Sequence, residues 1–172
     1  MLNKTSLFFL LMLLLGTTST FAQNAPKYGH MNLGNLLEML PDTKTANDNL
    51  KVFADKLTAK DDSLTKAFQA AVTDFQTKYQ SGLLTPIQAQ TREAELQKEQ
   101  EAIQKFEQDA QQMVTQKREE LLSPILTKIN DAIKAVATEN QYLMIFDTSS
   151  GAMLFAAESD DVTALVKKKL GL

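Results

Sequence analysis

The stretch QYLMIFDTSSGAMLFAAE, residues 141–158, decides the fold of this chain. Tyr142 to Phe146 is a continuous apolar run, DTSSG has the composition of a turn, and Ala152 to Ala157 is a second apolar run. This pattern predicts a β-hairpin with a loop of about four residues. Because an isolated two-stranded hairpin is only marginally stable in water, both strands need partners from elsewhere in the chain.

A long helical hairpin occupies the middle of the chain. No Gly or Pro interrupts residues 43–80, and apolar residues recur there three, four or seven positions apart, as on one face of a long helix. That stripe comprises Leu50, Phe53, Leu57, Leu64, Phe68, Val72, Phe75 and Tyr79. In SGLLTP (residues 81–86), Gly82 suits a left-handed helix end, Thr85 an N-cap and Pro86 the first position of a second helix. The chain is therefore expected to reverse here.

The second helix is predicted to run from Pro86 to about Asn140, with a weaker apolar stripe near the reversal. Pro124 lies inside it, which predicts a kink or break near Leu121–Pro124 because proline removes one backbone hydrogen bond. A last short helix should begin at a cap formed by Ser159 or Asp160.

The two ends of the chain are expected to meet. Tyr28 to Leu33 alternates like a half-buried strand, and the short helical segment after it stops at Pro41, where Asp42 or Thr43 can cap the next helix. The predicted fold is α+β and mostly α: a small β-rich body with a long projecting antiparallel α-helical hairpin. The predicted regions are residues 23–41 (first strand and short helix), 42–123 (hairpin, tip at 81–86) and 124–172 (helix end, β-hairpin and terminal helix).

This small body leaves apolar faces uncovered, so several copies are expected to associate through the strand region. The residues assigned to this contact are Tyr28, Met31, Leu33, Leu143, Ile145, Leu154 and Phe155.

Residues 1–22 have the pattern of a secretory signal. Lys4 precedes the apolar run LFFLLMLLL, and Thr20 and Ala22 are small residues at the positions that a signal peptidase reads. Nine apolar residues are too few to cross a bilayer core of about 30 Å. We therefore expect cleavage after Ala22 and an exported chain.

The composition argues against several classes of function. Without the signal, 17 basic residues face 21 acidic ones, whereas general nucleic-acid binding needs a concentrated basic face. There is no Cys, a single His, no glycine-rich phosphate loop and no metal-loop spacing of acidic residues. The sequence therefore predicts a protein that is not an enzyme and needs no cofactor or metal.

The residues at both ends of the chain resemble those of a known protein family. The order NLGNLLEMLP, two long helices, then AIKAVATENQYLMIFDTSSGAMLFAAESDDVTALVKKKLG is similar to the Skp (OmpH) family of periplasmic chaperones. Tyr142, Asp147, Asp161, Val162 and Thr163 take positions typical of that family's C-terminal body. The first segment matches through Met31, Asn32 and Leu36.

The resemblance implies a periplasmic homotrimer whose helical hairpins enclose unfolded outer-membrane proteins and release them without nucleotide. Well-known members are strongly basic, whereas residues 42–123 here have 11 Lys and Arg against 14 Asp and Glu. Apolar side chains are therefore the expected client contacts: Phe53, Phe68, Phe75, Tyr79, Leu83, Leu84 and Phe106. Most of them should also pack between the two helices, with Leu83 and Leu84 as the exceptions.

Two alternatives stay open. A coiled-coil envelope adaptor or structural protein would also use a helical hairpin, although such proteins usually have larger flanking β-domains. The family is also associated with lipopolysaccharide, and Lys167 to Lys169 could touch an anionic membrane surface. Compensation of the helix dipole accounts for these lysines more simply.

Overall fold

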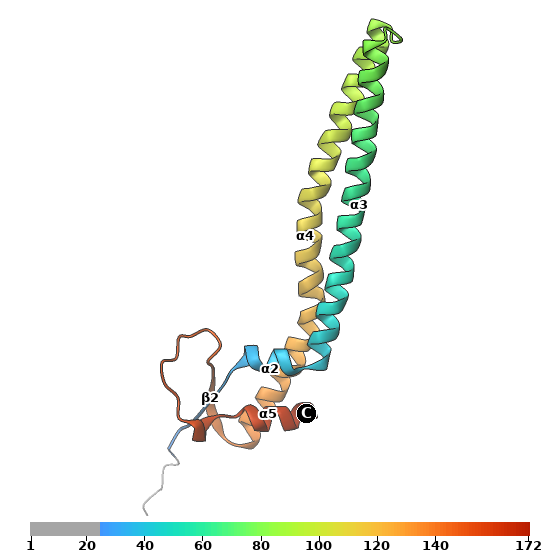
Figure 1. The fold of residues 1–172 in the computed structure, drawn as a ribbon. Coiled ribbons are helices and arrows are strands. Elements are labelled where there is room, and N and C mark those ends of the chain that lie inside the picture. The colour runs from blue at the N-terminus through green and yellow to red at the C-terminus, as the bar shows by residue number, and fades with distance from the viewer. Residues whose placement is uncertain (1–24) are drawn as a thin grey trace, which may run out of the picture.

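Two long antiparallel helices project from a small body that contains both ends of the described chain (Figure 1). The computed structural model describes residues 25–172, so the predicted signal peptide lies outside the described residues. The elements in chain order are β1 (Lys27–Met31), α2 (Leu33–Met39), α3 (Pro41–Gln80), α4 (Pro86–Glu139), β2 (Tyr142–Asp147), the 3₁₀ turn η1 (Glu158–Asp160) and α5 (Thr163–Leu170).

The two strands form a parallel sheet, which places the two ends of the described chain side by side. The register sets Gly29 opposite Ile145 and Met31 opposite Asp147. Parallel strands need a long crossover between them, and the helical hairpin supplies it. The prediction that the two ends share one body, with the helices projecting from it, is confirmed.

The predicted second strand of the hairpin, Ala152–Ala157, is wrong. This segment pairs with no strand of the described chain; it lies in a loop that leaves the body after β2 and returns through η1 (Figure 1). Thr148 explains the difference, because its backbone N–H donates to the carbonyl of Met31 at 2.9 Å and so extends the parallel pairing past β2. The other edge of β1 is also used, since Val162 N–H donates to the His30 carbonyl at 2.9 Å.

The core lies where the sheet, α2 and α5 meet the lower part of α4. Its most deeply buried large side chains are Met31, Leu36, Ile129, Val162 and Val166. Gly29 belongs to this tight packing, because a Cβ at that position would lie 2.8 Å from Cγ1 of Val162. The strand and the C-terminal segment can approach this closely only because the glycine has no side chain.

Pro124 lies inside α4, which stays one continuous 54-residue helix. Of the kink or break predicted near Leu121–Pro124, the break is therefore wrong, and the kink stays a prediction. The proline still removes one backbone hydrogen bond. Ile125 and Ile129 are buried in the core directly after it, and this packing holds the helix together across the missing bond.

The reversal between the long helices follows its sequence signals. Gly82 has φ +68°, and Pro86 is the first residue of α4. Thr85 caps α4 in a reciprocal capping box, in which its hydroxyl accepts from the N–H of Gln88 and the Gln88 side chain accepts from the N–H of Thr85. The turn is therefore well ordered by its own hydrogen bonds.

Two predicted caps differ from the structure. α3 begins at Pro41 with Leu40 as N-cap, rather than after a cap by Asp42 or Thr43, because proline is favoured at a first helical position. Ser159 and Asp160 lie in η1 and do not cap α5, which begins at Thr163.

Candidate interaction surfaces

Asp147 fixes the end of β2. Its Oδ1 accepts from the backbone N–H of Leu33 at 3.1 Å and from that of Ser149 at 2.9 Å, and its Oδ2 accepts from the Ser149 hydroxyl at 2.7 Å. The bonds from Ser149, and then that from Leu33, lower the pKa of Asp147 from its ordinary value despite some burial. The ionised carboxylate therefore ties β2 to the start of α2.

Asp161 fixes the return of the loop. Burial alone would raise its pKa, but the hydrogen bonds from Thr163 and the nearby His30 outweigh this and lower the pKa of Asp161. The Thr163 N–H donates to Asp161 Oδ1 at 2.7 Å, and the His30 ring Nε2 lies 2.9 Å from the carbonyl oxygen of Ala157. Both ends of the loop at residues 148–160 are thus held against the sheet.

Several apolar side chains of the body are exposed to solvent in the described chain. Leu154 and Phe155, in the middle of the loop, are 99% and 86% exposed. The uncovered body residues, as we call the whole set, are Tyr28, Leu143, Met144, Phe146, Leu154 and Phe155. Tyr28 and Phe146 stack loosely across the sheet, with ring centroids 6.4 Å apart. Exposed apolar side chains gathered on one small body mark an interaction surface.

The residues predicted to mediate self-association divide into two groups. Met31 is buried, and Leu33 and Ile145 pack against the core of the same chain. Tyr28, Leu143, Leu154 and Phe155 are exposed and remain available to another copy. Sequence reasoning did not single out Met144 and Phe146. The signal was present, because an apolar run without alternation places apolar side chains on both faces of a strand.

The residues predicted to contact clients also fall into two groups, half-buried and exposed. Phe53, Phe68, Phe75, Phe106 and Leu84 are half-buried, in or beside the seam between α3 and α4. Tyr79 and Leu83 are 62% and 71% exposed.

Ile87, which was not predicted, is 76% exposed in the first turn of α4. Its position directly after Pro86 was the available signal, because a first turn at a hairpin tip has little to pack against. The most accessible apolar side chains of the hairpin therefore gather at its end, which we call the tip, residues 79–91.

The seam is polar in the middle of the hairpin. Asp61 and Thr65 face it, whereas Leu64, which the sequence pattern assigned to the apolar stripe, is 36% exposed. Oδ1 of Asp61 is buried without a hydrogen-bond partner among the described residues. An open hollow of about 380 Å³ lies here, lined by Ala54, Leu57, Thr58, Asp61, Glu107, Ala110, Gln111 and Val114. The two helices are thus loosely joined at this point.

About half of the basic side chains along the hairpin form ion pairs within their own helix. Lys44–Asp48, Lys51–Asp55 and Lys105–Asp109 are i,i+4 ion pairs with N···O distances of 2.7–2.9 Å. Near the tip, Lys78 pairs with Asp74, and Arg92 pairs with Glu95 and Glu99. Such exposed pairs contribute little to stability. They occupy six of the eleven Lys and Arg side chains of residues 42–123, a stretch whose net charge is negative.

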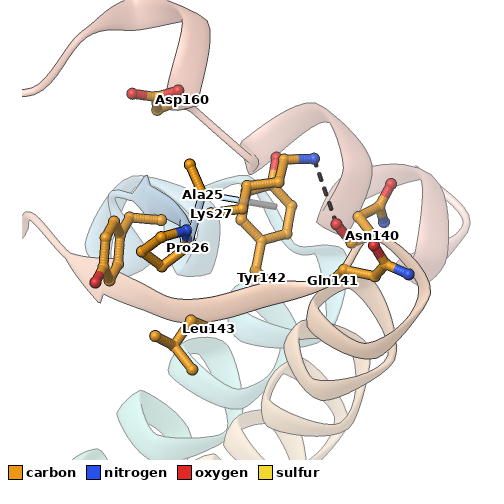
Figure 2. A pocket seen from close by; sticks show the side chains of 9 residues that line it. Ala25, Pro26, Lys27, Asn140, Gln141, Tyr142, Leu143 and Asp160 are labelled. Atoms are coloured by element: carbon orange, nitrogen blue, oxygen red, sulfur yellow. Dashed lines mark hydrogen bonds between the residues drawn. The ribbon is translucent and has the colours of Figure 1, made fainter. Parts of the chain in front are cut away.

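An open cleft of about 810 Å³ lies beside the first residues of both strands (Figure 2). Lys27 crosses it, with its Nζ 4.1 Å from the centre of the Tyr142 ring and 3.4 Å from the carbonyl oxygen of Asn140. Figure 2 shows Tyr142 and Leu143 on opposite sides of β2. A cation over an aromatic ring stabilises the strand but supplies no acid, base or nucleophile.

Within residues 25–172, no group of three or more His, Asp or Glu side chains could hold a metal ion. In the same part of the chain, no helix is both long and apolar enough to cross a bilayer. The candidate features described above are surfaces: the uncovered body residues, the tip and the hairpin between them.

A small two-stranded body with two long projecting helices defines a class of protein with helical arms, and the comparisons agree with it. The profile of the family described as "Outer membrane protein (OmpH-like)" matches residues 27–170. The chain belongs to this Skp/OmpH-like outer membrane chaperone family.

Two relatives show the likeness. The chain is 28% identical over 159 residues to the chaperone protein Skp of Pectobacterium atrosepticum, covering 88% of this chain and 90% of the relative. A crystal structure of an OmpH-like protein from Caulobacter crescentus superposes with a TM-score of 0.72 at 19% identity, over 84% of this chain and 83% of the other. The second likeness concerns the fold alone.

Proposed function

We propose that this chain is an ATP-independent holdase chaperone of the periplasm. In this proposal, copies assemble through their bodies into a homotrimer, and their helical hairpins, here called arms, enclose unfolded outer-membrane proteins and prevent their aggregation. Membership of the family, the likeness to a Skp chaperone and the predicted signal peptide support the compartment and the class.

One observation carries the proposal. The arm exposes apolar side chains at its tip and holds others half-buried along its seam, while its net charge is negative and six of its eleven Lys and Arg side chains are in ion pairs. Such a surface offers many weak apolar contacts and no single deep site. It suits clients that differ in sequence and share only exposed apolar side chains.

The chemistry of the client fits this surface. Strands of an outer-membrane barrel alternate apolar and polar side chains, and before folding they expose both these side chains and their unpaired backbone edges. Unfolded chains of this kind aggregate by pairing with one another. Arms that surround one client would keep it from pairing while their weak contacts exchange. The loosely joined seam at Asp61 supports arms that adapt to clients of different size.

The uncovered body residues support assembly. Leu154 and Phe155 would be buried once a second copy lies against the loop, and the free edge of β2 offers unpaired backbone groups to a strand of a neighbour. The number three comes from the resemblance to the family. The need for a partner comes from the exposed apolar residues themselves.

The test is an aggregation assay with the chain beginning at Gln23. An unfolded outer-membrane β-barrel protein is diluted from urea into buffer with or without a near-equal amount of the assembly, and light scattering is followed. We expect suppression at about 0.15 M NaCl that persists at about 1 M NaCl, where charge attraction is screened beyond about 3 Å. Suppression lost at high salt would point to electrostatic capture, and no suppression at either salt would overturn the holdase proposal.

A matched pair of variants locates the contact. Leu83→Ser removes an exposed apolar side chain at the tip, and Val52→Ser removes one that is 53% exposed near the base of α3. We expect weaker suppression for the tip variant alone. A pull-down that recovers one stoichiometric folded partner, instead of a mixture of unfolded proteins, would favour the envelope adaptor. Lipopolysaccharide is not part of the proposal, because the three lysines in the last turn of α5 suit the helix dipole, and Lys169 also pairs with Glu139.

A further inference from the structure

The tip differs from the rest of the arm in its charge. Residues 79–91 contain no charged side chain, and the nearest basic groups on either side, Lys78 and Arg92, are paired within their own helices. Tyr79, Leu83 and Ile87 are nevertheless among the most exposed apolar side chains of the described chain. The capping box of Thr85 and the left-handed Gly82 keep the turn ordered, so this exposure belongs to a formed surface.

The charge distribution of the arm favours the tip of another copy as the partner of this surface. Identical arms side by side repel each other, because residues 42–123 have a net charge of −3 in every copy. The tip is the part of the arm where two copies can touch without bringing like charges together. Burying an exposed apolar surface is favourable, and here no desolvated charge opposes it.

We propose that the tips of sibling copies contact one another and close the far end of the empty cage. This inference rests on the proposed assembly through the bodies, which tethers the tips near each other. Tethered groups meet at an effective concentration of the order of millimolar, so a weak contact is enough to be populated. The same weakness lets a client displace it, because the client competes for the same apolar side chains.

The arm has the structural means to lean inward. Asp61 and Thr65 interrupt the apolar seam about halfway along α3, and Oδ1 of Asp61 is buried there without a partner. The joint between the helices is therefore weakest at the middle of the arm, between the base, where Ile125 and Ile129 are buried, and the outer part, where Leu96 is buried. Bending at this point would bring the tips together without disturbing the body.

The absence of cysteine from the chain allows a direct test. Leu83→Cys places a single thiol at the tip, and the control Ser63→Cys places one on the exposed face of α3 near the middle of the arm. Each variant is oxidised without client, and covalent pairs are measured on a non-reducing gel. We expect pairs to form about tenfold faster at the tip, at a rate independent of protein concentration, as for a tethered contact. An unfolded outer-membrane protein should slow the tip reaction.

Other results would overturn the inference. Equal rates for the two variants would mean that the tips do not meet, and their occupant would then be the client or a lipid surface. A tip rate that grows with protein concentration would mean collisions between separate assemblies. Adding Tyr79→Lys and Ile87→Lys to the tip variant should reduce its rate to that of the control, with the fold checked by circular dichroism.

The mass in solution and the aggregation assay are measured on the same samples. An assembled, active holdase without faster tip pairing overturns only the tip contact. A single copy in solution overturns the proposed assembly as well.

Discussion

Oδ1 of Asp147, at the end of β2, accepts a hydrogen bond from the backbone N–H of Leu33, at the start of α2, over 3.1 Å. The two residues are 114 positions apart in the sequence. Thr148 adds to the same junction, because its N–H and hydroxyl both donate to the carbonyl of Met31, at 2.9 Å and 3.2 Å. This junction joins the N-terminal and C-terminal parts of the body. The arm is the segment of chain between these two parts.

We expect Asp147→Ala to destabilise the fold by about 0.5–1.5 kcal/mol, because the backbone N–H groups of the half-buried Leu33 and the exposed Ser149 lose their acceptor. The effect should depend on pH. The pKa of Asp147 is lower in the folded chain than in the unfolded one, so its contribution is complete above the unfolded value of about 3.9 and is lost as the pH falls through the folded value. Urea unfolding at several pH values measures both effects.

Asp62→Ala is the control for this prediction. Asp62 is exposed on α3 and makes no hydrogen bond or ion pair within the described residues. Its replacement should leave stability nearly unchanged at every pH. Equal stability losses for the two variants, or a loss at Asp147 that does not diminish as the pH falls below the unfolded pKa, would contradict the role given to the carboxylate.

Gly29→Ala should destabilise the body by about 1–3 kcal/mol, the usual cost of overpacking a core. The added Cβ would lie 2.8 Å from Val162 Cγ1 and 3.1 Å from the ring of Tyr142. Gly151→Ala is a useful contrast, because nothing lies within 4 Å of a Cβ there and only its φ of +71° opposes the change. Thermal unfolding of both variants separates overpacking from backbone strain. A smaller loss at Gly29 than at Gly151 would show that the strand can move away from α5.

The helices were predictable from the sequence because their signals are local. The capping box at Thr85 and the left-handed Gly82 need only their neighbours, and both are observed. The loop at Ala152–Ala157 was not predictable in the same way. Its apolar run favours a strand, but a strand exists only where another backbone offers hydrogen bonds, and within this chain Thr148 pairs with Met31 instead.

The candidate surfaces, too, were only partly predictable from the sequence. Phe53 and Phe106 belong to an apolar stripe, and the sequence could not say how far each is covered by the opposite helix. Leu83 and Leu84 are adjacent and were treated alike, yet one is 71% exposed and the other half-buried, because the turn directs neighbouring side chains to different sides. Exposure depends on turn geometry that composition does not determine.

Asp61→Leu should stabilise the arm by about 1–3 kcal/mol. The carboxylate oxygen is buried without a partner, and replacing it with an apolar side chain removes that desolvation cost while filling the seam between Leu57 and Thr65. Hydrogen exchange of the outer half of the arm should slow accordingly. Asp62→Leu is the matched control, since it makes the same chemical change on the exposed face. Equal protection in both variants would mean that added helix propensity, and not the seam, is responsible.

A stiffer arm should also hold clients less well, if bending at Asp61 matters to the proposed function. Asp61→Leu is then expected to suppress aggregation of small clients as the wild type does and of large clients less effectively. The control Asp62→Leu should act on both as the wild type does. Unchanged activity toward clients of every size would separate the stability of the seam from the chaperone activity.

Leu154→Asp together with Phe155→Asp should dissociate the proposed assembly. Both side chains are almost fully exposed in the single chain, so charges there cost the monomer little, whereas an apolar contact between copies would have to bury four charges for every two loops that meet. Sedimentation should show a fall from three copies to one at micromolar concentration, with the helix content unchanged. Leu83→Asp, at the tip, should leave the mass unaltered, because the bodies alone suffice to hold the copies together. Loss of assembly in the tip variant but not in the loop variant would place the principal contact between copies at the tip, and not at the body as proposed.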